Sequence, residues 1–155
     1  MTITSGATFT DFELDGFNSA EHRRDRSLVI FVWCSGCPTC RLALPFFDRL
    51  AARFPGADVV GISQDDAEST RLYCEEHGIG MRQLVDADLR VTRSLSLQSV
   101  PFFGLVQADG ALVESGYAWD VARLEAIAKL LSSGAGEPYQ PLVTDADHVP
   151  AFKPG

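Results

Sequence analysis

The chain of 155 residues has no long hydrophobic run, no excess of basic residues and only four cysteines. Its longest apolar run, residues 28–33, is far too short for a helix that crosses a bilayer. The 13 Lys and Arg residues are outnumbered by 21 Asp and Glu residues, and the net charge of −8 makes nucleic acid and anionic membrane surfaces poor partners. Four cysteines are too few for a disulfide scaffold of this size.

The N-terminus also lacks the basic and apolar segments of a signal peptide, so we expect a cytoplasmic protein. An exported protein whose leader had been removed would show the same N-terminus, and that alternative stays open. The length suits one domain, which we place at residues 1–133. Half of the eight prolines lie in the last 22 residues, so residues 134–155 are expected to form an extended tail that packs on the domain or stays mobile.

Apolar runs alternate with amphipathic segments, which is typical of an α/β protein. We expect an edge strand near Phe9, Phe12 and Leu14. The other expected strands are residues 28–33, 58–63, 84–85, 101–106 and 112–117. The expected helices are residues 38–54, 66–77, 88–95 and 121–131. Strands linked by helices predict a parallel part, and the Asp109-Gly110 turn predicts an antiparallel hairpin, so the central sheet should be mixed.

Three of the four cysteines, Cys34, Cys37 and Cys40, fall within seven residues. Cys37-Pro38-Thr39-Cys40 is a C-x-x-C motif that follows the expected buried strand and begins the expected helix. A helix N-terminus stabilises a thiolate at Cys37, and proline suits the first helical turn. Cys40 lies one turn further on, where its sulfur can attack a mixed disulfide on Cys37. The pattern predicts disulfide exchange with Cys37 and Cys40 as the catalytic residues.

The same cysteines also begin a metal-binding pattern. Cys34-x-x-Cys37-x-x-Cys40 opens a ferredoxin-type run, but its fourth ligand should precede Pro45, where Leu44 stands. A zinc site would need a fourth ligand brought in by folding, and the candidates are His22, His77 and His148. We expect neither a metal nor a cofactor, and a non-enzymatic three-cysteine metal-binding module remains the alternative.

Several short segments occur in the order and spacing of a known family. They are residues 31–41 (Phe-Val-Trp-Cys-Ser-Gly-Cys-Pro-Thr-Cys-Arg), 44–45 (Leu-Pro), 76–79 (Glu-His-Gly-Ile), 86–88 (Asp-Ala-Asp), 99–103 (Ser-Val-Pro-Phe-Phe) and 109–110 (Asp-Gly). Over residues 7–131 the chain resembles the TlpA/ResA-like thiol–disulfide oxidoreductases, which are related to the redoxin and AhpC/TSA proteins. The resemblance implies a thioredoxin-like three-layer α/β fold, with a central mixed β-sheet flanked by helices.

The resemblance also implies roles for residues outside the cysteine pair. Pro101 would be a cis-proline facing the active-site disulfide, and the backbone of Val100 would pair with a bound substrate peptide. Pro38, Thr39 and Trp33 would shape the site. The implied partners are protein disulfide or dithiol substrates and an upstream electron donor, and we expect a monomer.

Cys34 is an addition to the family pattern, because the family usually has a small residue there. It is either a small buried apolar residue or an auxiliary thiol able to exchange with the Cys37–Cys40 disulfide. The alternative enzyme is a peroxiredoxin-like thiol peroxidase, and the identity of residue 34 helps to decide against it. That class needs Thr or Ser three residues before its reactive cysteine and Pro seven residues before it. Ahead of Cys37 these positions hold Cys34 and Ile30, which disfavours a peroxidase.

Overall fold

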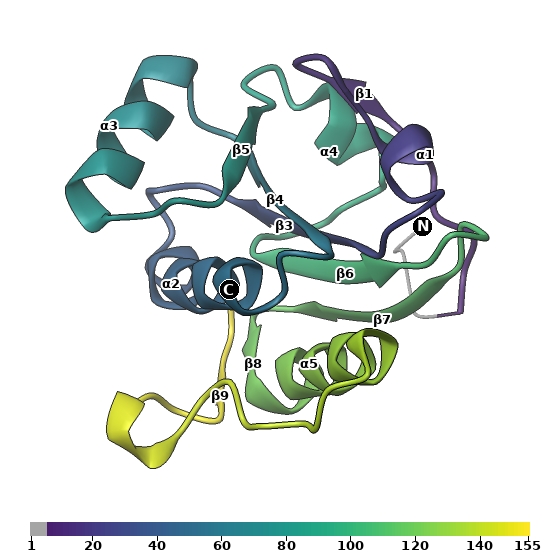
Figure 1. Cartoon of the computed structure of the whole chain (residues 1–155). Helices are drawn as coiled ribbons and strands as arrows, with labels where there is room; N and C mark the ends of the chain where they lie inside the picture. The colour runs from purple at the N-terminus through teal and green to yellow at the C-terminus, as the bar shows by residue number, and fades with distance from the viewer. Residues whose placement is uncertain (1–5) are drawn as a thin grey trace.

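The computed structural model describes residues 6–155, and its centre is a five-stranded sheet in the order β5-β4-β3-β6-β7 (Figure 1). The strands are β3 (Leu28–Trp33), β4 (Asp58–Ser63), β5 (Arg82–Val85), β6 (Phe102–Val106) and β7 (Leu112–Tyr117). Strand β4 runs parallel to both β3 and β5, whereas β6 is antiparallel to both β3 and β7. The predicted mixed sheet is confirmed, with the parallel part on the helix-linked side.

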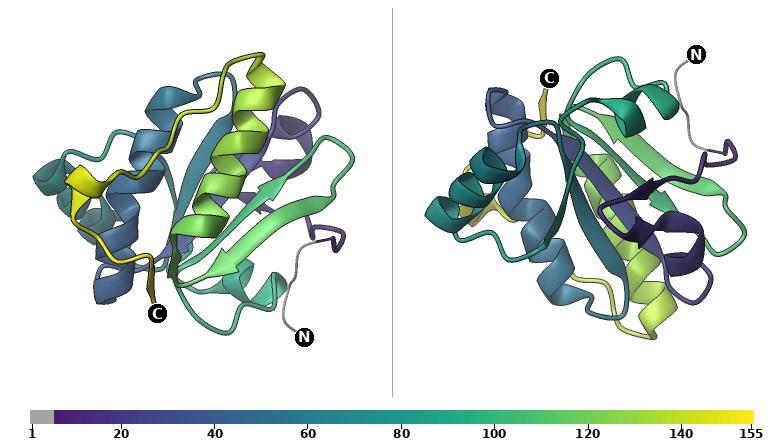
Figure 2. Two further views of the ribbon diagram at one scale, coloured as in Figure 1. Left: turned by 90° about the horizontal axis from the view of Figure 1, so that it is seen from below. Right: turned by 90° about the horizontal axis from the view of Figure 1, so that it is seen from above.

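Helices cover both faces of this sheet, which confirms the predicted three-layer arrangement. They are α1 (Ser19–His22), α2 (Pro38–Arg53), α3 (Ala67–His77), α4 (Arg90–Ser94) and α5 (Val121–Ala135). Helices α2 and α5 lie on one face, and α4 lies on the other with the N-terminal elements (Figures 1 and 2). Within residues 6–155, no helix has the length and apolar character needed to span a membrane.

Strand β3 supplies the centre of both hydrophobic layers, because all six of its residues are buried. Its alternate side chains point to opposite faces, as in any strand. Phe31 and Trp33 join the cluster beneath α2 and α5, and Ile30 and Val32 join the cluster on the α4 side. A strand buried on both faces reads as a continuous apolar run, which is why β3 could be placed from the sequence.

The edge strand expected near Phe9, Phe12 and Leu14 is confirmed only in part, because Leu14 lies in a strand and Thr8 forms a single antiparallel bridge with Ala111, whereas Phe9 and Phe12 lie outside any strand. Strand β1 (Glu13–Leu14) pairs instead with β2 (Phe17–Asn18) in a separate two-stranded sheet. Phe9 and Phe12 are buried against the α4-side cluster. Their spacing therefore reflects burial in a folded-over segment, which a short sequence window does not distinguish from strand alternation.

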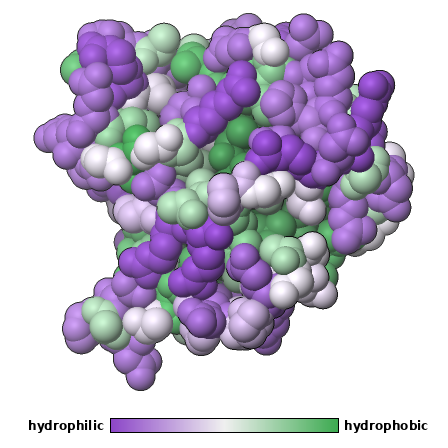
Figure 3. All heavy atoms as spheres, viewed as in Figure 1, coloured by the Kyte–Doolittle hydropathy of each residue, from purple (hydrophilic) through white to green (hydrophobic). Residues whose placement is uncertain are grey.

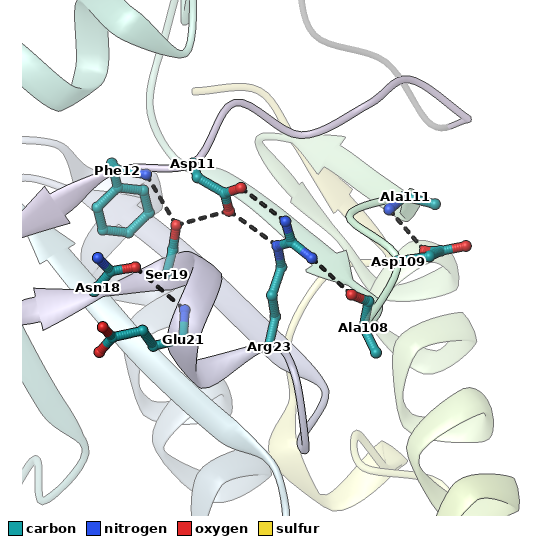
Figure 4. A network of polar contacts seen from close by, with 9 residues as sticks. All are labelled: Asp11, Phe12, Asn18, Ser19, Glu21, Arg23, Ala108, Asp109 and Ala111. Carbon is teal, nitrogen blue, oxygen red and sulfur yellow. Dashed lines mark hydrogen bonds and ion pairs between the residues drawn. The ribbon is translucent and has the colours of Figure 1, made fainter.

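Polar contacts hold this N-terminal segment in place (Figure 4). The Arg23 guanidinium donates to both carboxylate oxygens of Asp11, at 3.0 and 2.8 Å, and to the carbonyl of Ala108 at 2.6 Å. The hydroxyl of Ser19 donates to Asp11 and accepts from the backbone N–H of Phe12. One arginine thus links the N-terminal segment to the turn between β6 and β7.

Helix α5 is longer than predicted. It continues to Ala135, because Gly136, with φ of 68°, adopts the left-handed conformation that closes a helix. Residues 137–155, called the C-terminal segment below, then run back along the α2–α5 side (Figure 2). A loop around a 3₁₀ turn, Asp145–Asp147, stands out from the body of the molecule (Figure 3). A last strand, β9 (Phe152–Lys153), pairs antiparallel with β8 (Trp119–Asp120), and neither was predicted.

Candidate active site

The junction between β3 and α2 places the cysteine pair at the start of a helix. Cys37 is the N-cap residue of α2, with φ of −95° and ψ of 116°, and Pro38 is the first helical residue. The backbone N–H of Cys40 points back and donates to the Cys37 sulfur at 3.3 Å. A thiolate on Cys37 therefore faces the positive end of the helix dipole and one of the free N–H groups of the first turn.

The two sulfurs differ in their environments. Cys37 is partly exposed, whereas Cys40 is fully buried among the residues beneath α2 and α5. Burial raises the pKa of the Cys40 thiol far above its ordinary value, and the neighbouring Cys37 raises it further. The site therefore pairs one partly exposed cysteine with one buried cysteine.

Cys34 lies in the same turn, and its carbonyl accepts the backbone N–H of Cys37 at 3.4 Å. Burial raises the pKa of its thiol, and charge on Cys37 and on Asp65 adds to the effect. Within residues 6–155, no three His, Cys, Asp or Glu side chains converge to hold a metal ion. Cys34, Cys37 and Cys40 are therefore close in the sequence, but among the described residues they do not form a metal-binding group.

These raised pKa values predict how the stability of the reduced protein depends on pH. A thiol with a raised pKa holds its proton more tightly in the folded chain than in the unfolded chain. Its contribution to the folding free energy is therefore complete below the unfolded-state pKa of about 8.5 and is lost as pH rises above that value. Cys34, Cys40 and Cys74 all shift in this direction. We expect the thermal midpoint of the reduced protein to fall as pH increases beyond that value. The fall should be smaller for Cys40→Ala, and equal slopes for the two proteins would contradict this origin.

The cis-proline position lies against the cysteine pair. The peptide bond between Val100 and Pro101 is cis, and it stands just before β6. The thiol of Cys37 donates to the carbonyl of Val100 across 3.9 Å. Pro38 and Thr39 form the first turn of α2 on the other side of Cys37. Folding thus brings together residues 37–40 and 100–101, which are far apart in the sequence.

Trp33 has a different environment. Its side chain is fully buried, and its indole N–H donates to the side-chain oxygen of Gln83 at 2.9 Å. Its ring packs on Tyr73 of α3, with centroids 5.5 Å apart. Trp33 therefore supports the strand that carries the cysteine loop, and it lies in the core behind that loop.

Sequence reasoning missed two residues that hold the cysteine loop. The Asp65 carboxylate accepts the backbone N–H of Ser35 at 2.9 Å, and the Arg41 guanidinium donates to the carbonyl of Ser35 at 2.7 Å. The available signal was topological: β3 and β4 are parallel, so the residues that follow them meet at one edge of the sheet. Asp65 comes just after β4, directly beside the loop that follows β3.

Solved structures share this architecture at low sequence identity. A putative thiol:disulfide interchange protein DsbE from Chlorobium tepidum is 18% identical, with a TM-score of 0.73 over 86% of this chain and 99% of that one. The thioredoxin domain of a thiol-disulfide oxidoreductase from Bacteroides vulgatus is 18% identical, with a TM-score of 0.71 over 84% and 99%. A secreted Mycobacterium tuberculosis disulfide oxidoreductase homologous to E. coli DsbE is 24% identical, with a TM-score of 0.57 over 63% and 72%. These similarities show that the chain has a thioredoxin-like fold.

Sequence comparison identifies the family. The model of the AhpC/TSA family matches residues 5–115, which include the cysteine motif and the cis-proline. The chain belongs to the AhpC/TSA family. No curated protein sequence matches the chain significantly.

Proposed function

We propose that the protein is a thiol–disulfide oxidoreductase that exchanges disulfides with protein substrates through Cys37 and Cys40. The observation that carries this proposal is the geometry of the pair. Cys37 is partly exposed and caps α2, and its sulfur accepts the N–H of a fully buried Cys40 at 3.3 Å. The thioredoxin-like fold and the oxidoreductases of similar structure support the same chemistry.

The reaction proceeds in two sulfur-exchange steps. The Cys37 thiolate attacks one sulfur of the substrate disulfide, and the other substrate sulfur leaves as a thiolate. Cys40 then loses its proton, attacks the Cys37 sulfur and releases the second substrate thiol. The substrate gains two electrons and two protons, while Cys37 and Cys40 become a disulfide. An upstream dithiol donor returns the pair to its reduced form, and the reverse sequence oxidises a substrate dithiol.

Trapping the intermediate tests this assignment. Cys40→Ala leaves the Cys37 nucleophile intact but removes the group that resolves the mixed disulfide. We expect this variant to accumulate a covalent adduct with a disulfide-containing protein such as insulin, visible on a non-reducing gel and lost on reduction. Mass spectrometry should place the adduct on Cys37.

The matched controls are two double variants, one that combines Cys37→Ser with Cys40→Ala and one that combines Cys74→Ala with Cys40→Ala. The first lacks the Cys37 sulfur but keeps Cys34 and Cys74, and it should form no adduct. Cys74 lies on α3, outside the cysteine loop, so its replacement removes a sulfur without touching the site. An adduct that persists without Cys37 would assign the attacking sulfur elsewhere.

The cytoplasmic location expected from the sequence stays a prediction. Similar structures include a secreted oxidoreductase of Mycobacterium tuberculosis and an exposed lipoprotein thioredoxin of Streptococcus pneumoniae. Thiol–disulfide exchange operates both in the cytoplasm and outside it, and the redox potential of the compartment sets the direction of electron flow.

A further inference from the structure

The C-terminal segment is anchored to the α2–α5 side of the molecule. The Arg49 guanidinium donates to both carboxylate oxygens of Asp147, at 3.0 Å each, and lowers the pKa of that carboxyl to about 2. The Glu125 carboxylate accepts the backbone N–H groups of Leu142 and Val143. The Leu142 side chain is buried in the core beneath α2 and α5. These contacts fix the path of the segment well before its last residues.

Pairing with β8 then directs the segment toward the cysteine site. The indole N–H of Trp119 donates to the carbonyl of Pro150 at 2.7 Å, and the N–H of Val121 donates to the carbonyl of Ala151 at 3.0 Å. Residues Phe152 and Lys153 of β9 continue this antiparallel pairing. The end of the segment consequently lies in front of α2, close to its N-terminal turn (Figures 1 and 2).

The last two residues contact the site itself. The hydroxyl of Thr39, in the first turn of α2, donates to the carbonyl of Pro154 at 2.6 Å, and this threonine is only 2% exposed. A Cβ added to Gly155 would overlap the carbonyl oxygen of Val100 and come within 3.2 Å of Pro101 Cδ. Gly155 is therefore packed so closely against the cis-proline bond that a side chain does not fit. The Val100 carbonyl is the same group that accepts the Cys37 thiol.

We propose that residues 150–155 occupy the surface on which an extended protein substrate would dock, and that they exclude such substrates until they are displaced. This inference rests on the proposed thiol–disulfide exchange. The family resemblance implies that an extended substrate segment pairs with the backbone of Val100, and Gly155 is packed against that same group. Cys37 itself stays partly exposed with the segment in place. Small disulfides therefore reach Cys37 directly, whereas protein disulfides compete with the segment.

Two variants test this proposal: one displaces the docked end, the other removes it, and both keep the contacts that anchor the rest of the C-terminal segment. Gly155→Val introduces a side chain that overlaps the Val100 carbonyl, and a chain that ends at Pro150 lacks β9 but keeps the bonds to Arg49, Glu125 and Trp119. The matched control is Gly134→Ala, since a Cβ at Gly134 meets no atom within 4 Å. Each protein is compared in dithiothreitol-driven reduction of insulin and of bis(2-hydroxyethyl) disulfide.

We expect the insulin rate of both variants to rise about tenfold. The apparent affinity for a protein substrate equals the intrinsic affinity multiplied by the fraction of molecules whose docking surface is free, and both variants increase that fraction. The rate with bis(2-hydroxyethyl) disulfide should stay unchanged, and Gly134→Ala should behave as the parent chain. Equal insulin rates in all proteins would overturn the inference and leave the exchange chemistry intact. An equal acceleration of both substrates would also overturn it, because the segment would then control Cys37 itself.

A labelling experiment separates this inference from the proposed function. Alkylation of Cys37, followed by mass spectrometry, uses iodoacetamide as the small reagent and a maleimide on a long polyethylene glycol as the bulky one. Both variants should react faster than the parent chain with the bulky reagent only. An unchanged rate of labelling by the bulky reagent would overturn the inference that the segment occupies the docking surface. Failure of every protein to reduce either disulfide would overturn the exchange chemistry instead.

Discussion

Cys37→Ser is expected to lower the rate of insulin reduction, above the dithiothreitol background, by about a thousandfold or more. A serine hydroxyl is not ionised near neutral pH and forms no mixed disulfide, so the first exchange step has no nucleophile. The fold should be retained, because Cys37 is partly exposed and its sulfur accepts one backbone N–H from Cys40. A serine oxygen at a helix N-cap accepts the same kind of bond.

Circular dichroism and the thermal midpoint show whether Cys37→Ser is folded, and Cys74→Ala serves as the cysteine control outside the site. The control should keep its activity. Retention of the parent rate by Cys37→Ser would refute the nucleophile assignment, whatever the behaviour of Cys40. Rapid peroxide reduction by the parent chain would favour the peroxidase alternative, which the presence of Cys34 three residues before Cys37 argues against.

Phe31→Ala is expected to lower the free energy of unfolding by about 3–5 kcal/mol. Phe31 is fully buried at the centre of β3, and its ring stacks on Phe47 of α2 with centroids 4.3 Å apart. It pairs across the sheet with Phe103 of β6. Alanine at this position loses these contacts and leaves a cavity where the sheet meets the helix that carries the cysteines.

Equilibrium urea unfolding of the reduced protein measures this cost. Leu72→Ala on α3 is the matched control, because that side chain is 50% exposed and its removal should change the unfolding free energy by no more than about 0.5 kcal/mol. If Phe31→Ala lowers the free energy of unfolding by less than about 1 kcal/mol, the surrounding core residues must move in to fill the space that the ring occupied. The core would then be less rigid than its aromatic packing indicates.

The parts of the fold that the sequence predicts correctly are those with strong local signals. Strand β3 is a continuous apolar run, Asp120 caps α5 by accepting the N–H of Arg123, and Gly78 ends α3 in a left-handed conformation. The C-x-x-C motif likewise carries its own structural context, since it follows a buried strand and contains proline at a first helical position. These features depend on neighbours in the sequence, so a short window contains the information.

The parts that sequence reasoning missed depend on contacts between distant segments. Strand β9 has two residues, and its pairing with β8 uses backbone groups that every residue carries. Helix α5 passes Gly134 and ends at Ala135, because helical packing outweighs the modest cost of one internal glycine. The bond from Asp65 to the cysteine loop follows from strand order, and the contact of Gly155 with Val100 follows from the whole path of the C-terminal segment.

The positions of the two ends of the described chain have a practical consequence for fusion proteins. A polypeptide joined after Gly155 would begin directly beside Val100 and Thr39, so an affinity tag there would alter access to Cys37. Gly6, by contrast, bonds to Leu112 near the turn that joins β6 and β7, at the end of β6 opposite Pro101. A tag joined on the side of Gly6 is therefore expected to disturb access to Cys37 less than a tag joined after Gly155.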